Sequence, residues 1–435
     1  MKESKFNIFQ EIKNKKILAY NTLTTALVVL EPCVYKNIFE NHDYSQRDSI
    51  QLLEMGFLID DTFDEHQYLK SLRETVAKSD NKISNLTIAT TMDCNARCYY
   101  CFEHGCHHDT MTLETADELV KYICKNWNEK QICITWFGGE PLLAPHIIDY
   151  VTKCLEERSI NFISKITTNG FLLNEELCRK AKYMWHTTRI QISMDGMGEE
   201  YNKIKNYVRI DSYTNPFNVV IQNIEIALKT ELLVRIRINC NPDNMQKSIA
   251  FMEYLQSKFH KFPNFNAYFA PIDTDTEIAP PIASKFENET VHPYLQIIKT
   301  EEKYGKDIRP VVNQDEYLSS LRLYPCPTNC YASCAHVFSI DSRGDLYKCH
   351  RVLGKGKKYS SGNIKTGIIK NDIYQYFCNT DFSLPECKDC KLLPVCQGGC
   401  KINAYTYHDT HACIPTKAAI NEIILYYAKN MGVDC

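Results

Sequence analysis

From Asn85 onward, the chain alternates apolar runs typical of β-strands with amphipathic runs typical of helices, and this alternation constrains the fold most. The strand-like runs are LTIATT, QICITWF, NFISKITTN, RIQISMDG, LVRIRINCN and NFNAYFAPI, and the last helix-like run is HPYLQIIKTEEKYG. Strands that alternate with helices form a parallel sheet joined by crossover helices. The sequence therefore predicts an α/β fold, and six units are too few for a complete eight-stranded barrel.

The first strand-like run leads into CNARCYYCF, which places Cys94, Cys98 and Cys101 close together in one loop. Three thiolates can bind three irons of a cubane iron–sulfur cluster, which leaves one iron for a ligand that is not protein. A structural zinc site is the alternative, with Cys106 or His104 as its fourth ligand.

Charge and composition indicate which partners and which cellular compartment to expect. The formal net charge of −3 argues against a general binder of nucleic acids or membrane surfaces. The N-terminal MKESKFNIFQ has no apolar run of the signal-peptide kind, and no segment is long and apolar enough to span a bilayer. We therefore expect a cytoplasmic protein, and in a reducing compartment its 21 cysteines indicate metal binding rather than disulfides.

The Cys-x3-Cys-x2-Cys spacing, with an aromatic residue directly after it, resembles the signature of the radical S-adenosylmethionine (SAM) enzymes. The resemblance implies that residues 85–290 form a partial (β/α)6 barrel. It also implies that Cys94, Cys98 and Cys101 hold a [4Fe–4S] cluster whose open iron binds SAM. Such enzymes generate a 5′-deoxyadenosyl radical and take electrons from a donor such as flavodoxin or ferredoxin.

Polar strand ends are the expected SAM contacts. The segment FGGEP resembles the family's GGEP segment, where glycines permit close backbone approach and the carboxylate suits the SAM amino group. A turn with a capping Glu is the alternative. The ends of the next two strands resemble contacts to the SAM ribose and carboxylate, although ordinary turn chemistry also explains them. The predicted contacts are Gly138, Gly139, Glu140, Thr168, Ser193 and Asp195.

A second field of cysteines occupies residues 326–435. Its order resembles the SPASM domain, the C-terminal extension of many peptide-modifying radical SAM enzymes, and this implies two auxiliary [4Fe–4S] clusters, three in all. The resemblance assigns Cys334, Cys349 and Cys400 to the first auxiliary cluster, and Cys387, Cys390, Cys396 and Cys413 to the second. Cys330 is the preferred fourth ligand of the first, with Cys326 or a substrate thiol as alternatives. Zinc is the alternative for CKDCKLLPVC alone.

In residues 1–84, two strands are expected in KKILAYNTLTTALVVLEP and a short one in FLID, and helices are expected in VYKNIFEN, SQRDSIQLLEMGF and DEHQYLKSLRETVAKS, which suits a small winged-helix-like module. Such a module before a radical SAM–SPASM core resembles the recognition element of ribosomal peptide maturases. It is expected to bind a leader peptide as an added strand at a sheet edge. A helical cap without a binding role is the alternative. Residues 291–325 are expected to bridge the barrel and the SPASM domain.

Together, these resemblances imply a maturase that installs thioether crosslinks in a cysteine-containing precursor peptide, as sactipeptide and ranthipeptide synthases do. One alternative is an anaerobic sulfatase maturase, which forms formylglycine. Those enzymes usually carry Asp directly after the residue that matches Cys349, and this chain has His350 there. An enzyme that forms carbon–carbon or carbon–oxygen crosslinks is a further candidate, and so is a non-catalytic iron–sulfur scaffold or electron carrier.

Overall fold

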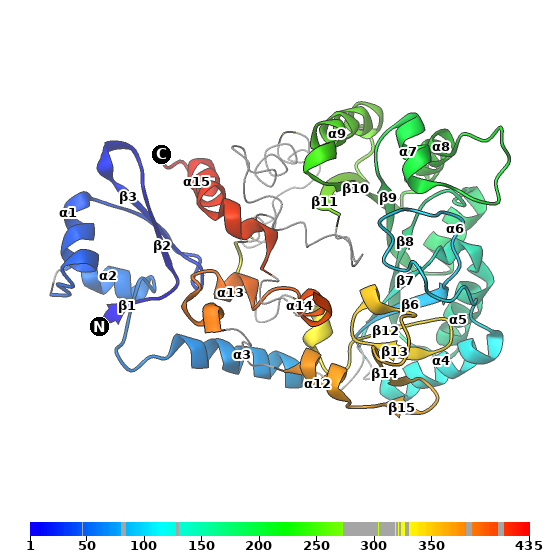
Figure 1. Ribbon diagram of the computed structural model, residues 1–435, viewed down its shortest axis with the longest axis horizontal. Helices are drawn as coiled ribbons and strands as arrows, with labels where there is room; N and C mark the ends of the chain where they lie inside the picture. The colour runs from blue at the N-terminus through cyan, green and yellow to red at the C-terminus, as the bar shows by residue number, and fades with distance from the viewer. Residues whose placement is uncertain are drawn as a thin grey trace.

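The computed structural model describes residues 1–45, 47–79, 84–127, 130–272, 303, 318, 321, 323–326, 330–379, 385–407 and 413–435. Figure 1 shows their arrangement. The predicted sixth helix, HPYLQIIKTEEKYG, lies outside these residues except for Lys303, and so does most of the predicted bridging region. None of the described helices combines the length and the apolar character needed to cross a membrane.

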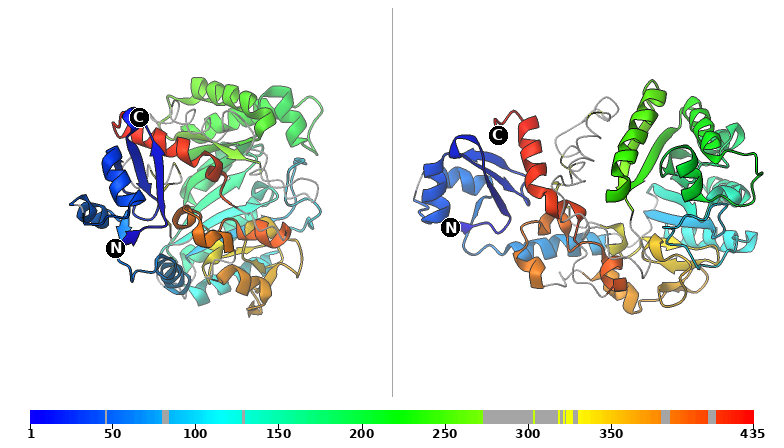
Figure 2. Two further views of the ribbon diagram at one scale, coloured as in Figure 1. Left: turned by 60° about the vertical axis from the view of Figure 1, so that its left-hand side comes forward. Right: turned by 45° about the horizontal axis from the view of Figure 1, so that its top comes forward.

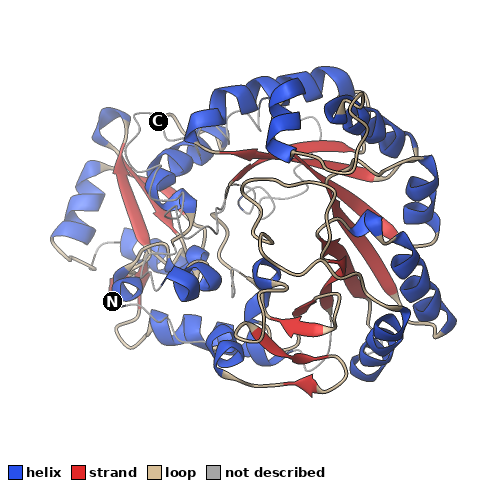
Figure 3. Ribbon diagram, turned by 45° about the vertical axis from the view of Figure 1, so that its right-hand side comes forward, coloured by secondary structure: helices blue, strands red, loops and turns tan. Residues whose placement is uncertain are grey.

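All of the predicted strands of the α/β region are present, and each pairs in parallel with its neighbours in sequence order. They are β6 (Asn85–Thr91), β7 (Ile132–Gly138), β8 (Phe162–Thr168), β9 (Thr187–Met194), β10 (Leu233–Cys240) and β11 (Phe265–Pro271). Figure 3 shows the helices on the outer side of this curved sheet. The prediction of an α/β fold with an open parallel sheet is confirmed.

The crossover helices bury the outer face of the sheet. They are α4 (Leu113–Asn126), α5 (Pro145–Glu157), α6 (Glu175–Tyr183), α8 (Pro216–Lys229) and α9 (Met245–Phe259). In β9, for example, Ile190, Ile192 and Met194 are fully buried beneath them, whereas the intervening Gln191 and Ser193 face inward and are half-buried. One short helix that was not predicted, α7 (Gly198–Lys205), follows β9.

The cysteine-rich region continues the same sheet. Its strands are β12 (Phe338–Ile340), β13 (Asp345–Tyr347), β14 (Ser360–Asn363) and β15 (Gly367–Ile368). β12 pairs in parallel with β6, and the next three strands extend the sheet in antiparallel fashion. The sheet therefore crosses the boundary that we expected between residues 85–290 and 326–435. Strands this short carry too little alternation to be read from sequence.

The remaining elements of the C-terminal region are short helices around the cysteines. They are η6 (Tyr331–Ser333), η7 (His350–Val352), α12 (Asp372–Cys378), η8 (Pro385–Asp389), α13 (Leu393–Cys396), α14 (Lys401–Tyr407), η9 (Pro415–Ala419) and α15 (Ile420–Asn430). Two lysines, the buried Lys348 and the half-buried Lys401, stabilise this region by donating hydrogen bonds to backbone carbonyl oxygens. Lys348 Nζ lies 2.9 Å from the carbonyl oxygen of Val337, and Lys401 Nζ lies 2.6 Å from that of Phe377.

The N-terminal unit contains a three-stranded antiparallel sheet in the order β2-β3-β4. Its elements are β1 (Lys2–Glu3), β2 (Asn7–Glu11), η1 (Lys13–Lys15), β3 (Ile17–Asn21), β4 (Leu27–Leu30), α1 (Pro32–Tyr35), η2 (Lys36–Glu40), α2 (Asp48–Glu54), β5 (Leu58–Ile59) and α3 (Glu65–Ser79). The strands β3, β4 and β5 and the helices α1 to α3 were predicted; β1, β2 and η1 were not.

The N-terminal sheet packs on the C-terminal end of the chain. The ring of Tyr20 lies 6.2 Å from that of Tyr427 in α15, and the Tyr20 hydroxyl donates to the Leu323 carbonyl at 3.0 Å. Thr22 Oγ1 donates to the Lys391 carbonyl. Figure 2 shows α15 beside this sheet. The N-terminal sheet and the C-terminal region of the chain therefore pack directly against each other.

Candidate functional site

The three cysteines of the first motif lie in the loop after β6. Burial raises the pKa of Cys94 to about 12, and the nearby charges of Glu140, Cys98 and Cys101 add to this. Burial likewise raises the pKa of Cys101 to about 12, with a contribution from Cys98. The loop therefore places its three thiols within electrostatic range of one another. Within the described ranges, no three His, Cys, Asp or Glu side chains meet closely enough to hold a single metal ion.

Two glycines let the end of β7 approach the base of this loop. The amide of Gly139 donates to the Thr91 carbonyl at 3.0 Å, and the amide of Glu140 donates to the Asp93 carbonyl at 2.9 Å. A Cβ atom on Gly138 would lie 2.1 Å from the Thr91 carbonyl oxygen, and one on Gly139 would lie 2.2 Å from that of Asp93. Only glycine fits these positions.

Glu140 is fully buried and joins two strand ends. Its carboxylate accepts hydrogen bonds from Thr168 Oγ1 at 2.7 Å, Asn169 N at 2.8 Å and Leu142 N at 3.1 Å. Burial raises the pKa of Glu140, although these hydrogen bonds oppose the shift. Glu140 thus caps η3 (Pro141–Leu143), as expected of a turn with a capping Glu, and also fixes Thr168 beside it. A carboxylate has acceptor sites for further donors, so a bound ammonium group remains compatible with this geometry.

Asp195, at the end of β9, is the centre of a buried polar network. Its Oδ2 lies 2.7 Å from Lys205 Nζ, and its Oδ1 accepts from Asn239 Nδ2 at 2.6 Å. The hydroxyl of Tyr100, from the cysteine loop, donates to Asp195 as well. The backbone of Lys205 also receives a hydrogen bond from Arg97 N at 2.8 Å. Lys205 therefore holds the cysteine loop against the fourth strand of the barrel.

Lys205 and Tyr100 were not predicted from the sequence. Lys205 belongs to GEEYNKIK, which reads as an ordinary solvated helix, so no sequence signal marked it as buried. Tyr100 lies inside the cysteine motif, and its position between two ligand candidates was the one available signal. Ser193, by contrast, is half-buried on the inner face of β9.

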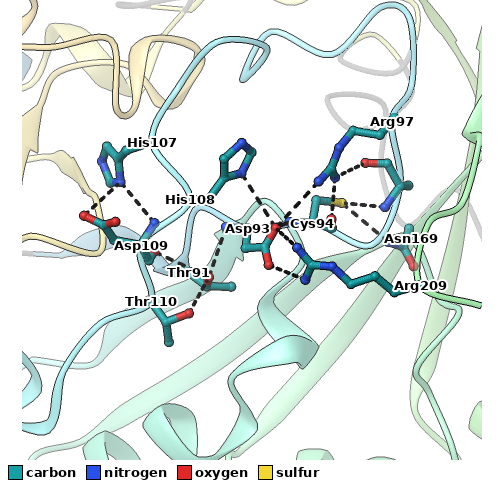
Figure 4. A network of polar contacts seen from close by, with 11 residues as sticks. Thr91, Asp93, Cys94, Arg97, His107, His108, Asp109, Thr110, Asn169 and Arg209 are labelled. Carbon is teal, nitrogen blue, oxygen red and sulfur yellow. Dashed lines mark hydrogen bonds and ion pairs between the residues drawn. The ribbon is translucent and has the colours of Figure 1, made fainter.

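A second polar network fixes the base of the cysteine loop (Figure 4). Asp93 accepts from Arg209 at 2.6 Å and from the amide of Cys94 at 2.9 Å, and His108 lies 3.6 Å away. Burial acts to raise the pKa of Asp93, but the Arg209 and Cys94 hydrogen bonds and the Arg209 charge lower it overall. On the other side of the loop, Asn169 Nδ2 lies 3.9 Å from Cys94 Sγ.

Cys106 does not join Cys94, Cys98 and Cys101 as a further ligand candidate. Its thiol lies 3.4 Å from the Leu353 carbonyl, and its side chain packs in an apolar cluster that includes Met92 and Val352. It thus behaves as a small buried hydrophobe, which counts against the zinc alternative that used Cys106.

The second cysteine field separates into two groups. Burial raises the pKa of Cys330, and the charges of Cys400 and Cys334 contribute to this. Burial raises the pKa of Cys349 to about 12, with contributions from Cys330 and Cys400. Cys330 is therefore within electrostatic range of Cys334, Cys349 and Cys400. Cys326, the alternative to Cys330, is exposed.

The other group contains Cys387, Cys390, Cys396 and Cys413. Burial raises the pKa of Cys396 to about 11, and the charges of the other three cysteines contribute to the shift. Lys417 Nζ lies 3.6 Å from Cys413 Sγ. Cys387, Cys390, Cys396 and Cys413 are thus within electrostatic range of one another. The assignment of both cysteine groups to clusters, including the choice of Cys330 as the fourth ligand of the first, stays a proposal that is taken up below.

His350 lies between the first auxiliary group and the barrel. Its ring centroid is 5.4 Å from that of Phe137, at the end of β7, and 5.9 Å from that of Phe102, directly after the first cysteine motif. Tyr331 OH lies 2.7 Å from His350 Nδ1. Burial lowers the pKa of His350 to about 4, helped by the charges of Arg351 and Arg237. The imidazole is therefore neutral at pH 7.

Comparison with known proteins agrees with these features. The model of the Radical SAM superfamily matches residues 88–254. The cysteine-type anaerobic sulfatase-maturating enzyme of Clostridium novyi is 26% identical over 342 residues, which cover 74% of this chain and 88% of that protein. A GTP 3′,8-cyclase of Clostridium perfringens is 26% identical over 330 residues, which cover 71% of this chain and 95% of that protein.

Solved structures share the fold. Native anSMEcpe with bound AdoMet and Cp18Cys peptide has a TM-score of 0.59 at 19% identity, covering 80% of this chain and 98% of that one. Streptococcus suis SuiB bound to precursor peptide SuiA has a TM-score of 0.51 at 16% identity, covering 96% of this chain and 99% of that one. The chain is an enzyme with a radical SAM domain over residues 88–254, and the superfamily to which this domain belongs uses SAM and a [4Fe–4S] cluster.

Proposed function

We propose that this enzyme is a peptide maturase that installs thioether crosslinks in a ribosomally made, cysteine-containing precursor. The observation that carries the proposal is the combination of three units in one chain. A radical SAM sheet is extended by a region with two four-cysteine groups, and that region packs against an N-terminal sheet with outer edges available for a peptide.

The residues of the barrel mouth fit a SAM-binding cluster. Cys94, Cys98 and Cys101 supply three thiolates and leave one iron open. When bound, SAM and the reduced cluster supply a 5′-deoxyadenosyl radical that removes a hydrogen atom from the substrate. The resemblance implies that Glu140 would receive the SAM amino group and that Gly138, Gly139, Thr168, Ser193 and Asp195 would lie around the bound SAM.

The two further cysteine groups fit auxiliary clusters. Cys330, Cys334, Cys349 and Cys400 would hold one [4Fe–4S] cluster, and the group from Cys387 to Cys413 would hold the other. A thioether bond requires net oxidation of the peptide, so an electron must leave the substrate after hydrogen abstraction. Clusters held by these cysteines, in a SPASM domain over residues 326–435, would give that electron a route out of the substrate. A donor such as flavodoxin or ferredoxin would separately supply the electron that reduces the SAM-binding cluster.

The N-terminal unit, residues 1–84, would recruit the precursor. Among the described residues, no strand pairs with the outer edge of β2 or of β4. An extended leader peptide can add to either edge through main-chain hydrogen bonds, and this tether raises the effective concentration of the core peptide at the barrel. The overlap with SuiB over nearly the whole chain, N-terminal unit included, supports this arrangement.

Formylglycine formation is the second candidate. The similarity to the Clostridium novyi enzyme and to anSMEcpe favours it, whereas His350 in place of the Asp expected there argues against it. The test is to reduce the reconstituted enzyme with dithionite and supply SAM with either a cysteine-rich precursor or a sulfatase-derived cysteine peptide. Thioether formation in the first peptide supports the proposal, and an aldehyde in the second would replace it with formylglycine formation.

A further inference from the structure

The N-terminal unit packs on the loop that carries two cysteines of the second auxiliary group. Phe6 and Leu69 form a buried apolar cluster with Leu393 of α13, and the side chain of Cys387 packs against this cluster. Phe6 directly precedes β2 and Leu69 lies in α3, which runs beside α13 (Figure 1). Two separate elements of the N-terminal unit therefore reach one cysteine of the second group.

The N-terminal unit also holds the backbone of this Cys387–Lys391 loop at two places. His66 Nε2, in the first turn of α3, donates to the Lys388 carbonyl oxygen. The hydroxyl of Thr22, directly after β3, donates to the Lys391 carbonyl oxygen, and the Thr22 side chain is fully buried. Because both acceptors belong to the main chain, these two contacts fix the path of the loop between the cysteines and α13.

A buried polar network joins the two donors to one frame. Glu65, the neighbour of His66, accepts a hydrogen bond from Ser4 Oγ. Asn21, the neighbour of Thr22, donates from its Nδ2 to the same Ser4 Oγ at 3.1 Å. Ser4, Asn21 and Glu65 are all buried. Because a satisfied interior network rigidifies the elements that it joins, β3 and α3 hold the cysteine loop as a unit.

One further contact to the loop lies at the surface. Lys5 Nζ is 3.3 Å from Asp389 Oδ1, and both side chains are more than half exposed. Exposed ion pairs of this kind contribute little to stability. The buried apolar cluster and the two hydrogen bonds to main-chain carbonyls therefore account for most of the hold on the loop.

We propose that the N-terminal unit is a structural part of the second auxiliary centre, with Thr22 and His66 as positioning residues for the Cys387–Lys391 loop. The inference rests on the proposed function, which assigns the cysteines of this loop to a cluster. It adds a second role to the unit that would recruit the precursor. Because coupling between two sites is reciprocal, the unit stabilises the ligands of the cluster and the cluster stabilises the unit.

The test measures how fast the reconstituted holoenzyme loses its second auxiliary cluster to an iron chelator under anaerobic conditions. The EPR signal of this cluster is the one that Cys413→Ala lacks. His66→Ala and Thr22→Val should each speed its loss about fivefold, because the loop must open and one hydrogen bond contributes about that factor to the opening equilibrium. The first auxiliary cluster should keep its rate of loss. Thr22→Ser retains the hydroxyl and should restore the wild-type rate and EPR line shape.

Gln67→Ala is the matched control, because Gln67 is the exposed neighbour of His66 in α3, and it should leave all rates unchanged. Tm reports whether each variant folds, and if His66→Ala does not, the comparison of Thr22→Val with Thr22→Ser carries the test. The reciprocal measurement is hydrogen–deuterium exchange, which should increase in residues 65–72 of α3 when Cys413→Ala removes the second cluster.

The two ways of failing are distinguishable. Wild-type rates of cluster loss in both His66→Ala and Thr22→Val, or unchanged exchange in Cys413→Ala, would overturn the inference and leave the proposed function intact. A wild-type enzyme without any EPR signal that depends on Cys413 would overturn the cluster assignment in the proposed function, and the inference with it.

Discussion

Lys205 Nζ lies 2.7 Å from Asp195 Oδ2, and the two side chains are only 3% and 1% exposed. This buried ion pair joins the helix after β9 to the strand end where a SAM contact is expected. It also reaches the cysteine loop, because Tyr100 donates to Asp195 and Arg97 donates to the Lys205 backbone. The pair is therefore a positioning element for the loop that gathers Cys94, Cys98 and Cys101.

Removing one partner of this pair should be costly. Lys205→Met leaves the Asp195 carboxylate buried without its cation, so we expect the free energy of unfolding to fall by about 3–5 kcal/mol. Lys229→Met, which breaks an exposed i,i+4 pair with Glu225, should cost less than about 1 kcal/mol. Denaturant unfolding of both variants measures the difference. Equal losses would show that Lys205 does not support the loop.

The glycines after β7 should not tolerate a side chain. Gly138→Ala places a Cβ atom 2.1 Å from the Thr91 carbonyl oxygen, so the cysteine loop must shift, and we expect loss of SAM cleavage. Gly432→Ala is the control, because Gly432 also has a positive φ but has open space around it. That variant should retain SAM cleavage. Full activity in Gly138→Ala would contradict the close approach of these segments.

The cysteine groups predict iron stoichiometry. Three cubanes require about twelve irons per chain, and replacing Cys94, Cys98 and Cys101 together by Ala should leave about eight. Cys330→Ala should perturb the Mössbauer or EPR signature of one auxiliary cluster, whereas Cys326→Ala should not, because Cys326 is exposed and Cys330 lies near Cys334 and Cys400. Iron for a single cluster in the wild type would refute the SPASM assignment.

Strand addition at the N-terminal sheet is testable with proline. Proline at an outward-facing amide removes a main-chain donor that an added strand needs. Val29→Pro on β4 and Glu11→Pro on β2 probe the two outer edges of the sheet. One of them should abolish leader-peptide binding in fluorescence anisotropy while leaving SAM cleavage without peptide unchanged. Retention of leader binding in both folded variants would show that the peptide binds elsewhere.

Much of the fold followed from patterns that the sequence displays. The six parallel strands were predicted because each is a distinct apolar run that alternates with an amphipathic helix. The two auxiliary cysteine groups came from the resemblance to the SPASM domain, and their role as cluster ligands stays a prediction. The extension of the sheet by β12 to β15 could not be predicted, because strands of two to four residues are too short to show an alternation of apolar and polar residues.

The buried network around Asp195 was the other feature that could not be predicted from sequence patterns. Lys205 is buried only because its helix folds back onto the cysteine loop, and burial of that kind depends on tertiary contacts.

The most direct test of the peptide maturase account is mass spectrometry of a cysteine-rich precursor encoded beside the enzyme, after incubation with dithionite-reduced holoenzyme and SAM. The account predicts 5′-deoxyadenosine together with a peptide that loses a pair of hydrogens and one alkylatable thiol for each crosslink. SAM cleavage with fully loaded clusters but an unmodified precursor, or conversion of its cysteine to an aldehyde, would contradict it.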